Sequence, residues 1–141
     1  MDKADGGICT LCLEPPATSV IIRTTADIIE HVAHFRTKSQ EFLLCLSLNS
    51  RHQLISRRII TVGLVDSVPA HPREIFAGPI TDRAASIIIV HNHPSGDPNP
   101  SPHDINMTQQ IIASGQLLGI PLHEHVILTA NGYRSLRGEL F

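Results

Sequence analysis

The sequence predicts a single α/β domain, of the α+β kind, in which helices flank one mixed β-sheet. The chain has 141 residues, which suits one domain with a sizeable core. Segments with helical spacing of apolar residues alternate with short β-branched segments. Residues 86–90, Ser-Ile-Ile-Ile-Val, form the unbroken apolar run expected of a strand that is covered on both faces. Residues 1–20 show no clear periodicity, so we expect an irregular arm over 1–20 and the domain over 21–141.

The first half of the domain is expected to contain a helix, a hairpin and a second helix. Thr24 or Thr25 can cap the first helix, whose apolar residues 28, 29, 32 and 35 follow helical spacing. Residues 42–48 form a strand candidate, 49–52 a turn, and 53–65 a second strand. The second helix begins near Pro72, because proline suits the first helical turn.

The second half is expected to alternate strands with one more helix. The apolar run gives a strand over 86–91, and the periodicity then predicts a helix over 102–116. A strand over 125–129 follows, and Asn131-Gly132 is a strong hairpin signal before a last strand over 133–136. The order α-β-β-α-β-α-β-β indicates a mixed sheet.

Composition and charge disfavour several classes of function. The formal net charge is −2, and the 11 lysines and arginines are scattered, so no basic face for nucleic acid is indicated. No apolar run approaches the roughly 18 residues of a membrane span. Three cysteines, an odd number, and a start without a secretory signal favour the cytoplasm. Cys9 and Cys12 form a C-x-x-C pair, but only Cys45 remains elsewhere, so a four-thiolate zinc site cannot be completed within one chain.

The most polar segment of the chain, residues 91–104, follows directly after the buried strand. Residues two apart in a strand share a face, so His91 and His93 can present two imidazoles side by side. A catalytic zinc site needs three protein ligands and one open position, and Asp104 could supply the third ligand. The intervening Pro-Ser-Gly-Asp-Pro-Asn-Pro is turn-forming and could fold Asp104 back towards the histidines.

A purely structural interpretation fits the same residues. Ser101 can cap a helix, Pro102 suits its first position, and Asp104 stands three residues after the cap. Asp104 would then only bind a backbone N–H, and His103 would be an exposed first-turn residue. The two interpretations are compatible, because a helix start is a rigid place to mount a ligand.

The full spacing of the segment, H-x-H, seven residues, S, two residues, D, resembles the signature of the JAMM (MPN+/JAB) metalloproteases. The stretch "VHNHPSGDPNPSPHDI" is similar to RadC-like proteins in particular, as are "GLVDSVPAHPREIF" before it and "LLGIPLHEHVIL" after it. The resemblance covers about residues 24–136. It implies a fold of the JAB/MPN type, which is cytidine-deaminase-like.

The resemblance also implies a role for each site residue. His91, His93 and Asp104 would hold one zinc ion per chain, and Glu41, upstream of a strand, would act as general base on the zinc-bound water. Ser101 would help stabilise the oxyanion that forms during attack on an amide carbonyl. The implied reaction is hydrolysis of a peptide or isopeptide bond, with a peptide or protein as the substrate.

Three further observations bear on this interpretation. The helix-hairpin-helix region usual in full-length RadC-like proteins is not expected in this chain, so DNA repair is associated by the family's name only. A non-catalytic scaffold and a DNA-associated protein or nuclease remain the alternatives. The second H-x-H, His123 to His125, lacks a serine and an aspartate at the required spacing and is expected to be a strand entering the sheet; Asn92 is expected to face away from the ligands.

Overall fold

The computed structural model describes residues 20–63 and 70–141 and confirms the predicted fold class, a single mixed sheet with helices on both faces. Residues 1–19 of the predicted arm, with Cys9 and Cys12, lie outside the described residues. The elements are α1 (Thr25–Val32), the short 3-10 helix η2 (Ala33–Phe35), β1 (Glu41–Leu48), β2 (Leu54–Gly63), α2 (Pro72–Asp82), β3 (Ser86–Asn92), α3 (Pro102–Leu118), β4 (Leu122–Leu128) and β5 (Tyr133–Ser135).

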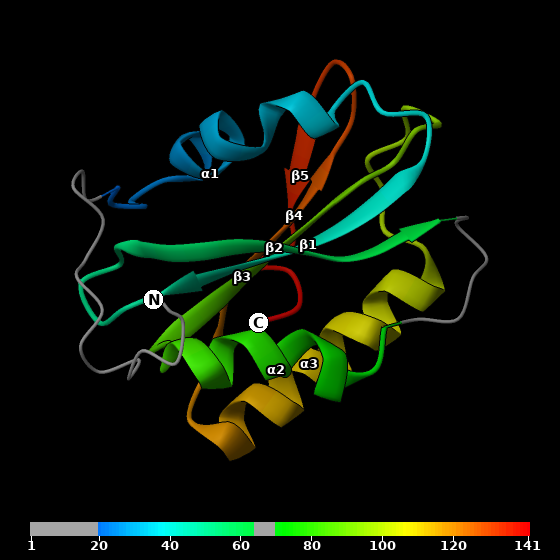
Figure 1. Cartoon of the computed structure of the whole chain (residues 1–141). Helices are drawn as coiled ribbons and strands as arrows, with labels where there is room; N and C mark the ends of the chain where they lie inside the picture. The colour runs from blue at the N-terminus through cyan, green and yellow to red at the C-terminus, as the bar shows by residue number, and fades with distance from the viewer. Residues whose placement is uncertain (1–19, 64–69) are drawn as a thin grey trace.

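The sheet has the strand order β2-β1-β3-β4-β5. The pairs β2–β1, β1–β3 and β4–β5 are antiparallel, whereas β3 and β4 are parallel and joined by the crossover helix α3. Seen nearly edge-on in Figure 1, the sheet lies between α1 on one side and α2 and α3 on the other. The central strand β3 is therefore covered on both faces, which explains its uninterrupted Ile-Ile-Ile-Val run.

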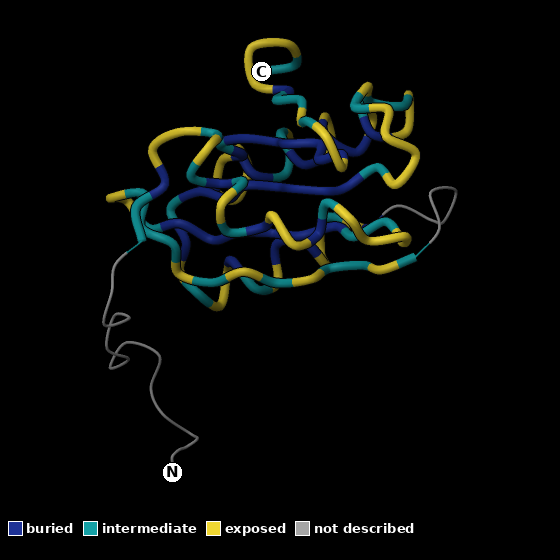
Figure 2. The backbone as a smooth tube through the Cα atoms, turned by 90° about the horizontal axis from the view of Figure 1, so that it is seen from above, coloured by how far each residue is buried: buried dark blue, intermediate teal, exposed yellow. Residues whose placement is uncertain are grey.

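Two apolar cores form, one on each face of the sheet. Figure 2 shows the strands as the buried centre of the molecule, with exposure concentrated in the connecting loops. On one face, Ile75 and Phe76 of α2 and Ile111 of α3 pack against the sheet. On the other face, Ile28 and Val32 of α1 do so. The sheet is thus held from both sides, and its strand ends are fixed in space.

Among the described residues, several element boundaries differ from the predicted ones by one residue, and two differ by two or three residues. The helix predicted over 102–116 continues to Leu118, because Gly119 takes the left-handed conformation that ends it (φ 73°). The strand predicted from His125 already begins at Leu122, since Leu122 pairs with Ile87 of β3. The connection between α3 and β4 is therefore a tight turn that leaves no room for a longer loop.

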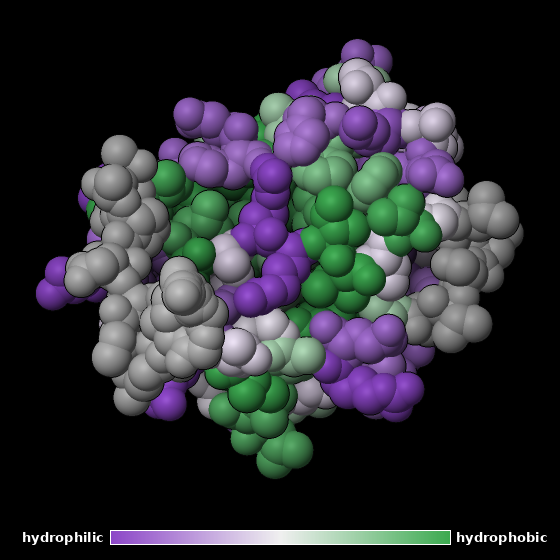
Figure 3. Space-filling view, in the orientation of Figure 1, coloured by the Kyte–Doolittle hydropathy of each residue, from purple (hydrophilic) through white to green (hydrophobic). Residues whose placement is uncertain are grey.

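The surface of the described residues is apolar along one edge of the sheet. The edge strand β2 exposes Ile55, Ile59 and Val62. Figure 3 shows apolar side chains gathered on the front of the molecule, where β2 crosses it in Figure 1. No helix in the described part of the chain has the length and apolar character to cross a lipid bilayer.

Replacement of Gly115 by alanine is expected to destabilise the fold, although alanine favours helices. A Cβ at this buried position of α3 would lie 2.6 Å from the backbone oxygen of Ile120, which cannot move without shifting β4. We expect the free energy of unfolding to fall by about 1–3 kcal/mol, as in other overpacked cores. Urea denaturation of Gly115→Ala measures this. Gln116→Ala, at the exposed neighbouring position, should leave the free energy nearly unchanged; a stable Gly115→Ala would contradict the close approach.

Candidate metal centre

Four side chains predicted from the sequence converge at one end of the sheet. Glu41, His91, His93 and Asp104 each offer one ligand atom, and these atoms lie within 4.8 Å of one another. The Nε2 atoms of His91 and His93 are 3.0 Å apart. The Asp104 carboxylate lies 3.3 Å from the first of these nitrogens and 3.1 Å from the second. The four residues come from β1, β3, α3 and the loop after β3. The fold thus brings together residues as far apart in the sequence as Glu41 and Asp104, which are separated by 63 positions (104 − 41).

The antiparallel pairing of β1 with β3 places the carboxylate of Glu41 beside the histidines. Leu43 pairs with His91, so the start of β1 lies next to the end of β3. Glu41 and Leu43 share a face of the sheet, as do His91 and His93, because side chains alternate along a strand. That face is the one covered by α3, whose first turn contributes Asp104.

Asp104 completes the capping box of α3 and points into the cluster at the same time. The Ser101 backbone N–H donates to Asp104 Oδ2 (2.9 Å), and the Asp104 N–H donates to Ser101 Oγ (3.0 Å). This is a complete capping box. The same Oδ2 faces His93. The structural and the metal-binding interpretations of the segment are therefore compatible. The cap fixes the carboxylate before any ligand arrives.

A buried hydrogen-bond chain determines which nitrogen of His91 carries its proton. The Thr108 hydroxyl donates its single hydrogen to the Asp104 carbonyl (2.7 Å), so it can only accept from His125 Nδ1 (2.7 Å). Burial, and then the nearby His91, hold the pKa of His125 well below its usual value, so this ring is neutral and its Nε2 is an acceptor. His91 Nδ1, 2.9 Å away, must therefore donate to it. A neutral His91 is left with a lone pair on Nε2.

The loop after β3 fixes the second histidine in the same way. His93 Nδ1 lies 2.8 Å from the backbone oxygen of Asp97, and a carbonyl oxygen can only accept. The neutral ring of His93 therefore also has its lone pair on Nε2. Lone pairs of two imidazoles and one carboxylate then face one another at about hydrogen-bond distance. These lone pairs repel one another unless a cation lies among them, so this set of donor atoms fits a metal ion.

The pKa shifts in the cluster also indicate that a positive charge is required among its members. Burial opposes ionisation of Asp104, but its hydrogen bonds with His91 and His93 outweigh burial and hold the pKa of this carboxyl well below its usual range. Burial disfavours the charged form of His93, yet the carboxylate of Asp104 and the carbonyl of Asp97 raise the pKa of His93 overall. Without a metal, a proton between His93 and Asp104 supplies the positive charge that the site needs.

Glu41 differs from the other three members of the cluster. Burial raises the pKa of Glu41 above its ordinary value, although the neighbouring His91 and His93 act against this. Its Oε1 atom is buried and has no hydrogen-bond partner among the described residues. A carboxylate that is partly desolvated and uncommitted is suited to take up a proton.

Asn92 holds the backbone on both sides of Glu41. Its Oδ1 accepts from the Phe42 N–H (2.7 Å), and its Nδ2 donates to the Gln40 carbonyl (2.9 Å). The Asn92 side chain is fully buried, with 1 % of its surface exposed. Although Asn92 does not belong to the ligand set, it fixes the position from which Glu41 reaches the cluster.

An open cleft of about 380 Å³ leads to the cluster. Its described lining includes Glu41, His93, Ser101 and Asp104, together with Gly63 at the end of the edge strand β2. Three lining residues carry carboxylates, and none of the described ones is a lysine or arginine. The described part of the lining therefore offers no guanidinium or ammonium group to a phosphate.

Replacement of Thr108 by valine is expected to weaken metal binding without touching a ligand. Valine keeps the shape of threonine but removes the acceptor for His125 Nδ1–H. The His125 ring can then switch to the tautomer that is protonated on Nε2. His91 Nδ1 must accept from that Nε2–H, so the proton of His91 is forced onto its own Nε2. We expect the affinity for zinc to fall by about 10–100-fold, as for other outer-shell partners. Competition with a fluorescent chelator measures it. The matched control is Thr81→Val in α2, which loses the same kind of hydroxyl bond, to Ala77 O; equal affinities in both variants would refute the proton chain.

Comparison with known proteins places the chain in a family. The model of the RadC-like JAB domain matches residues 22–140, so the chain belongs to this family. It is similar to UPF0758 proteins: one of Methanospirillum hungatei is 49 % identical over 109 residues, which is 77 % of this chain and 48 % of that protein. One of Desulforamulus reducens is 41 % identical over 130 residues, 92 % of this chain and 57 % of that protein. The chain spans about half the length of these curated relatives.

Sequence reasoning missed the residues that support the ligands. His125 was expected only to enter the sheet, but it orients His91, and Asn92 was given no role. Thr108 was not considered at all. A signal for His125 did exist, since a histidine inside an apolar strand needs a buried hydrogen-bond partner. The partner itself could not be read from the sequence, because it depends on how β4 and α3 lie beside β3.

Proposed function

We propose that the protein is a zinc-dependent hydrolase of the JAMM type that cleaves a peptide or isopeptide bond. The observation that carries the proposal is the convergence of three lone pairs, from His91, His93 and Asp104, beside an uncommitted Glu41. Zinc held by three protein ligands supplies a Lewis acid and lowers the pKa of water to about 7.

The protein's own side chains would then handle the protons and the developing charge. Glu41 accepts a proton from the attacking water and returns it to the leaving amine, for which its raised pKa suits it. The Ser101 hydroxyl accepts from the Asp104 N–H, so its own hydrogen is free to donate to the carbonyl oxygen of the substrate. Asn92 keeps Glu41 in place through the backbone of residues 40 and 42.

The lining of the cleft favours an amide over a phosphodiester. Its described residues bring carboxylates and no lysine or arginine, whereas proteins that bind nucleic acid neutralise phosphates with these cations. The formal net charge of −2 agrees. A scaffold role is disfavoured, because a scaffold does not require a carboxylate with a buried, unpartnered oxygen beside a ligand set.

Incubation with a defined peptide library tests the proposal. The zinc-loaded protein, the same protein with chelator, and the chelated protein with zinc restored are compared by mass spectrometry for new peptide termini. A supercoiled plasmid is incubated in parallel. New termini that disappear with chelator and return with zinc support the proposal. Cleavage of the plasmid alone would instead establish the nuclease alternative.

A further inference from the structure

A second cavity, of about 400 Å³, lies at the opposite end of the sheet from the metal centre. It opens where β3 begins, at Ser86, and where the turn between β1 and β2 passes. Five residues of strand separate Ser86 from His91, which is about 17 Å at the usual rise. The cavity is therefore independent of the cluster that carries the proposed hydrolysis.

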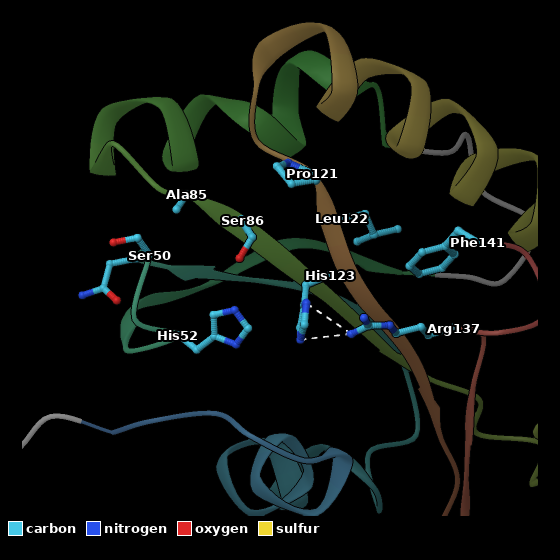
Figure 4. Close-up of a pocket in the computed structure, with 10 residues that line it drawn as sticks. Ser50, His52, Ala85, Ser86, Pro121, Leu122, His123, Arg137 and Phe141 are labelled. Atoms are coloured by element: carbon cyan, nitrogen blue, oxygen red, sulfur yellow. Dashed lines mark hydrogen bonds between the residues drawn. The ribbon is translucent and has the colours of Figure 1, made fainter.

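Nitrogen-bearing side chains from three segments converge on this cavity. Figure 4 shows His52, His123 and Arg137 on one side of it. The His52 and His123 rings are in edge contact, with centroids 4.7 Å apart, and Arg137 Nη1 lies 3.2 Å from both ring nitrogens of His123. Neither the lining nor any described ion pair provides a carboxylate side chain for Arg137. The described side chains that line the cavity thus bring one guanidinium and two imidazoles and no carboxylate.

The Ser86 hydroxyl is a buried group without a partner at the same place. Only 8 % of Ser86 is exposed, and its Oγ makes no hydrogen bond to any described residue. In Figure 4 this oxygen points to the side of the cavity on which the two imidazoles lie. Buried hydroxyls are nearly always satisfied, so the hydrogen of this one is available to an acceptor inside the cavity.

His52 adopts a backbone conformation that glycine would take more easily. Its φ is 60°, in the left-handed region, where a residue with a Cβ is strained. The residue after a type I turn in a hairpin loop is often left-handed and often glycine. Glycine would occupy this position with less strain, and the histidine that stands here places its ring at the cavity.

We propose that this cavity is a second binding site, for a small molecule that carries a phosphate monoester. Arg137, the two imidazoles and the Ser86 hydroxyl would bind the phosphate oxygens. The remaining wall includes Pro121, Leu122 and Phe141, which Figure 4 shows on other sides of the cavity. A phosphate alone would not fill the volume, and the apolar wall suits the organic part of the ligand.

A neighbouring cavity adds a cation to the same region. It shares His123 and Arg137 with the first one and is also lined by Arg23, before α1, and by Glu124 of β4. The Glu124 carboxylate is occupied, since it accepts from Ser135 Oγ at 2.8 Å and from the His125 N–H at 2.9 Å. Arg23 and Glu124 bring opposite charges to this neighbouring cavity, and Glu124 is the only described acidic side chain that lines either cavity.

The affinity for an anion is expected to rise as the pH falls. Burial, followed by the charges of Arg137 and His52, lowers the pKa of His123. A bound anion favours protonated imidazole and so raises this pKa again. Between about pH 8 and pH 5.5, the affinity for an anion of fixed charge should therefore rise as the protonated fraction of His123 rises. Sulfate is the probe for this arm, because its own charge does not change in that range.

Titration with inorganic phosphate, followed by backbone amide NMR at constant ionic strength, tests the proposal. Saturable shifts at residues 52, 86 and 123 are expected, and glycerol phosphate should bind more tightly than phosphate. Two variants identify the site. Arg137→Gln should weaken binding by at least about tenfold, the effect of one lost charge-assisted contact. His52→Gly should also weaken it while raising the thermal midpoint, since glycine relieves the strained φ.

The matched control is Arg51→Gln, which removes one positive charge from the same turn but not from the cavity lining. It should bind phosphate within about twofold of the unaltered protein. Absence of saturation, or equal binding by Arg51→Gln and Arg137→Gln, would overturn the proposal. Equal affinity for phosphate and glycerol phosphate would also overturn the monoester assignment. None of these outcomes bears on the hydrolase, because no variant touches its residues.

Discussion

Glu41→Gln is expected to keep its zinc and to lose hydrolytic activity. Glutamine has nearly the same shape as glutamate but cannot accept a proton from water, whereas the ligand atoms of His91, His93 and Asp104 stay in place. General acid–base catalysis contributes about 10²–10⁴-fold, so kcat should fall by a factor of that size. The measurement combines zinc content by elemental analysis with the rate on a peptide identified from the library.

A matched substitution controls for the change of charge. Glu30→Gln removes the same charge from an exposed position of α1 and should leave both zinc content and rate unchanged. If Glu41→Gln kept full activity, Glu41 would not be the base. If it lost its zinc instead, Glu41 would be a ligand rather than the group that moves the proton.

His93→Ala is expected to abolish zinc binding at working concentrations. The substitution removes one of the three proposed zinc ligands. His91 and Asp104 then also lose the imidazole that contacts both of them. Loss of an outer-shell contact alone costs 10–100-fold, so the loss of a ligand should weaken binding by at least about a hundredfold. Zinc should also raise the thermal midpoint of the unaltered protein but not that of the variant, because binding stabilises the folded state.

His103→Ala is the control for this substitution. His103 is adjacent to Asp104 in the sequence but exposed, on the first turn of α3, and it does not belong to the cluster. Zinc content should be about one per chain in this variant, as in the unaltered protein. Equal zinc content in His93→Ala and His103→Ala would show that the metal binds elsewhere.

Local sequence signals were enough to predict the elements of the fold. The helix over α1 was indicated by the spacing of its apolar residues, and the structure adds a capping box between Thr24 and Asp27. The run of β3 indicated a central strand, and its neighbours on both sides bear this out. The early start of β4 was not predictable, because only pairing with Ile87 extends the strand to Leu122.

The four members of the site were found through a motif and a resemblance. The i, i+2 spacing of His91 and His93 and the helix start at Ser101 are local, so they could be read from the sequence. Glu41 came from the resemblance only; its place beside the cluster depends on the antiparallel register of β1 and β3. The same holds for His125, Thr108 and Asn92, whose partners are far away in the sequence.

The convergence of residues at the second cavity could not be predicted from the sequence either. Its histidines, at positions 52 and 123, come from a turn and from the start of β4, and Arg137 follows β5. Nothing in the spacing of these residues predicts that they meet. They meet because strand pairing brings the last residues of β1 and the first residues of β3 and β4 to the same end of the sheet.

Anomalous diffraction at the zinc absorption edge, from crystals of the zinc-loaded protein, tests the central claim most directly. We predict one anomalous peak, bonded to His91 Nε2, His93 Nε2 and the Asp104 carboxylate, with Glu41 near it but not bonded to it. A peak bonded to other residues, or no peak at these atoms, would contradict the account and leave residues 91–104 as a strand end and a helix cap.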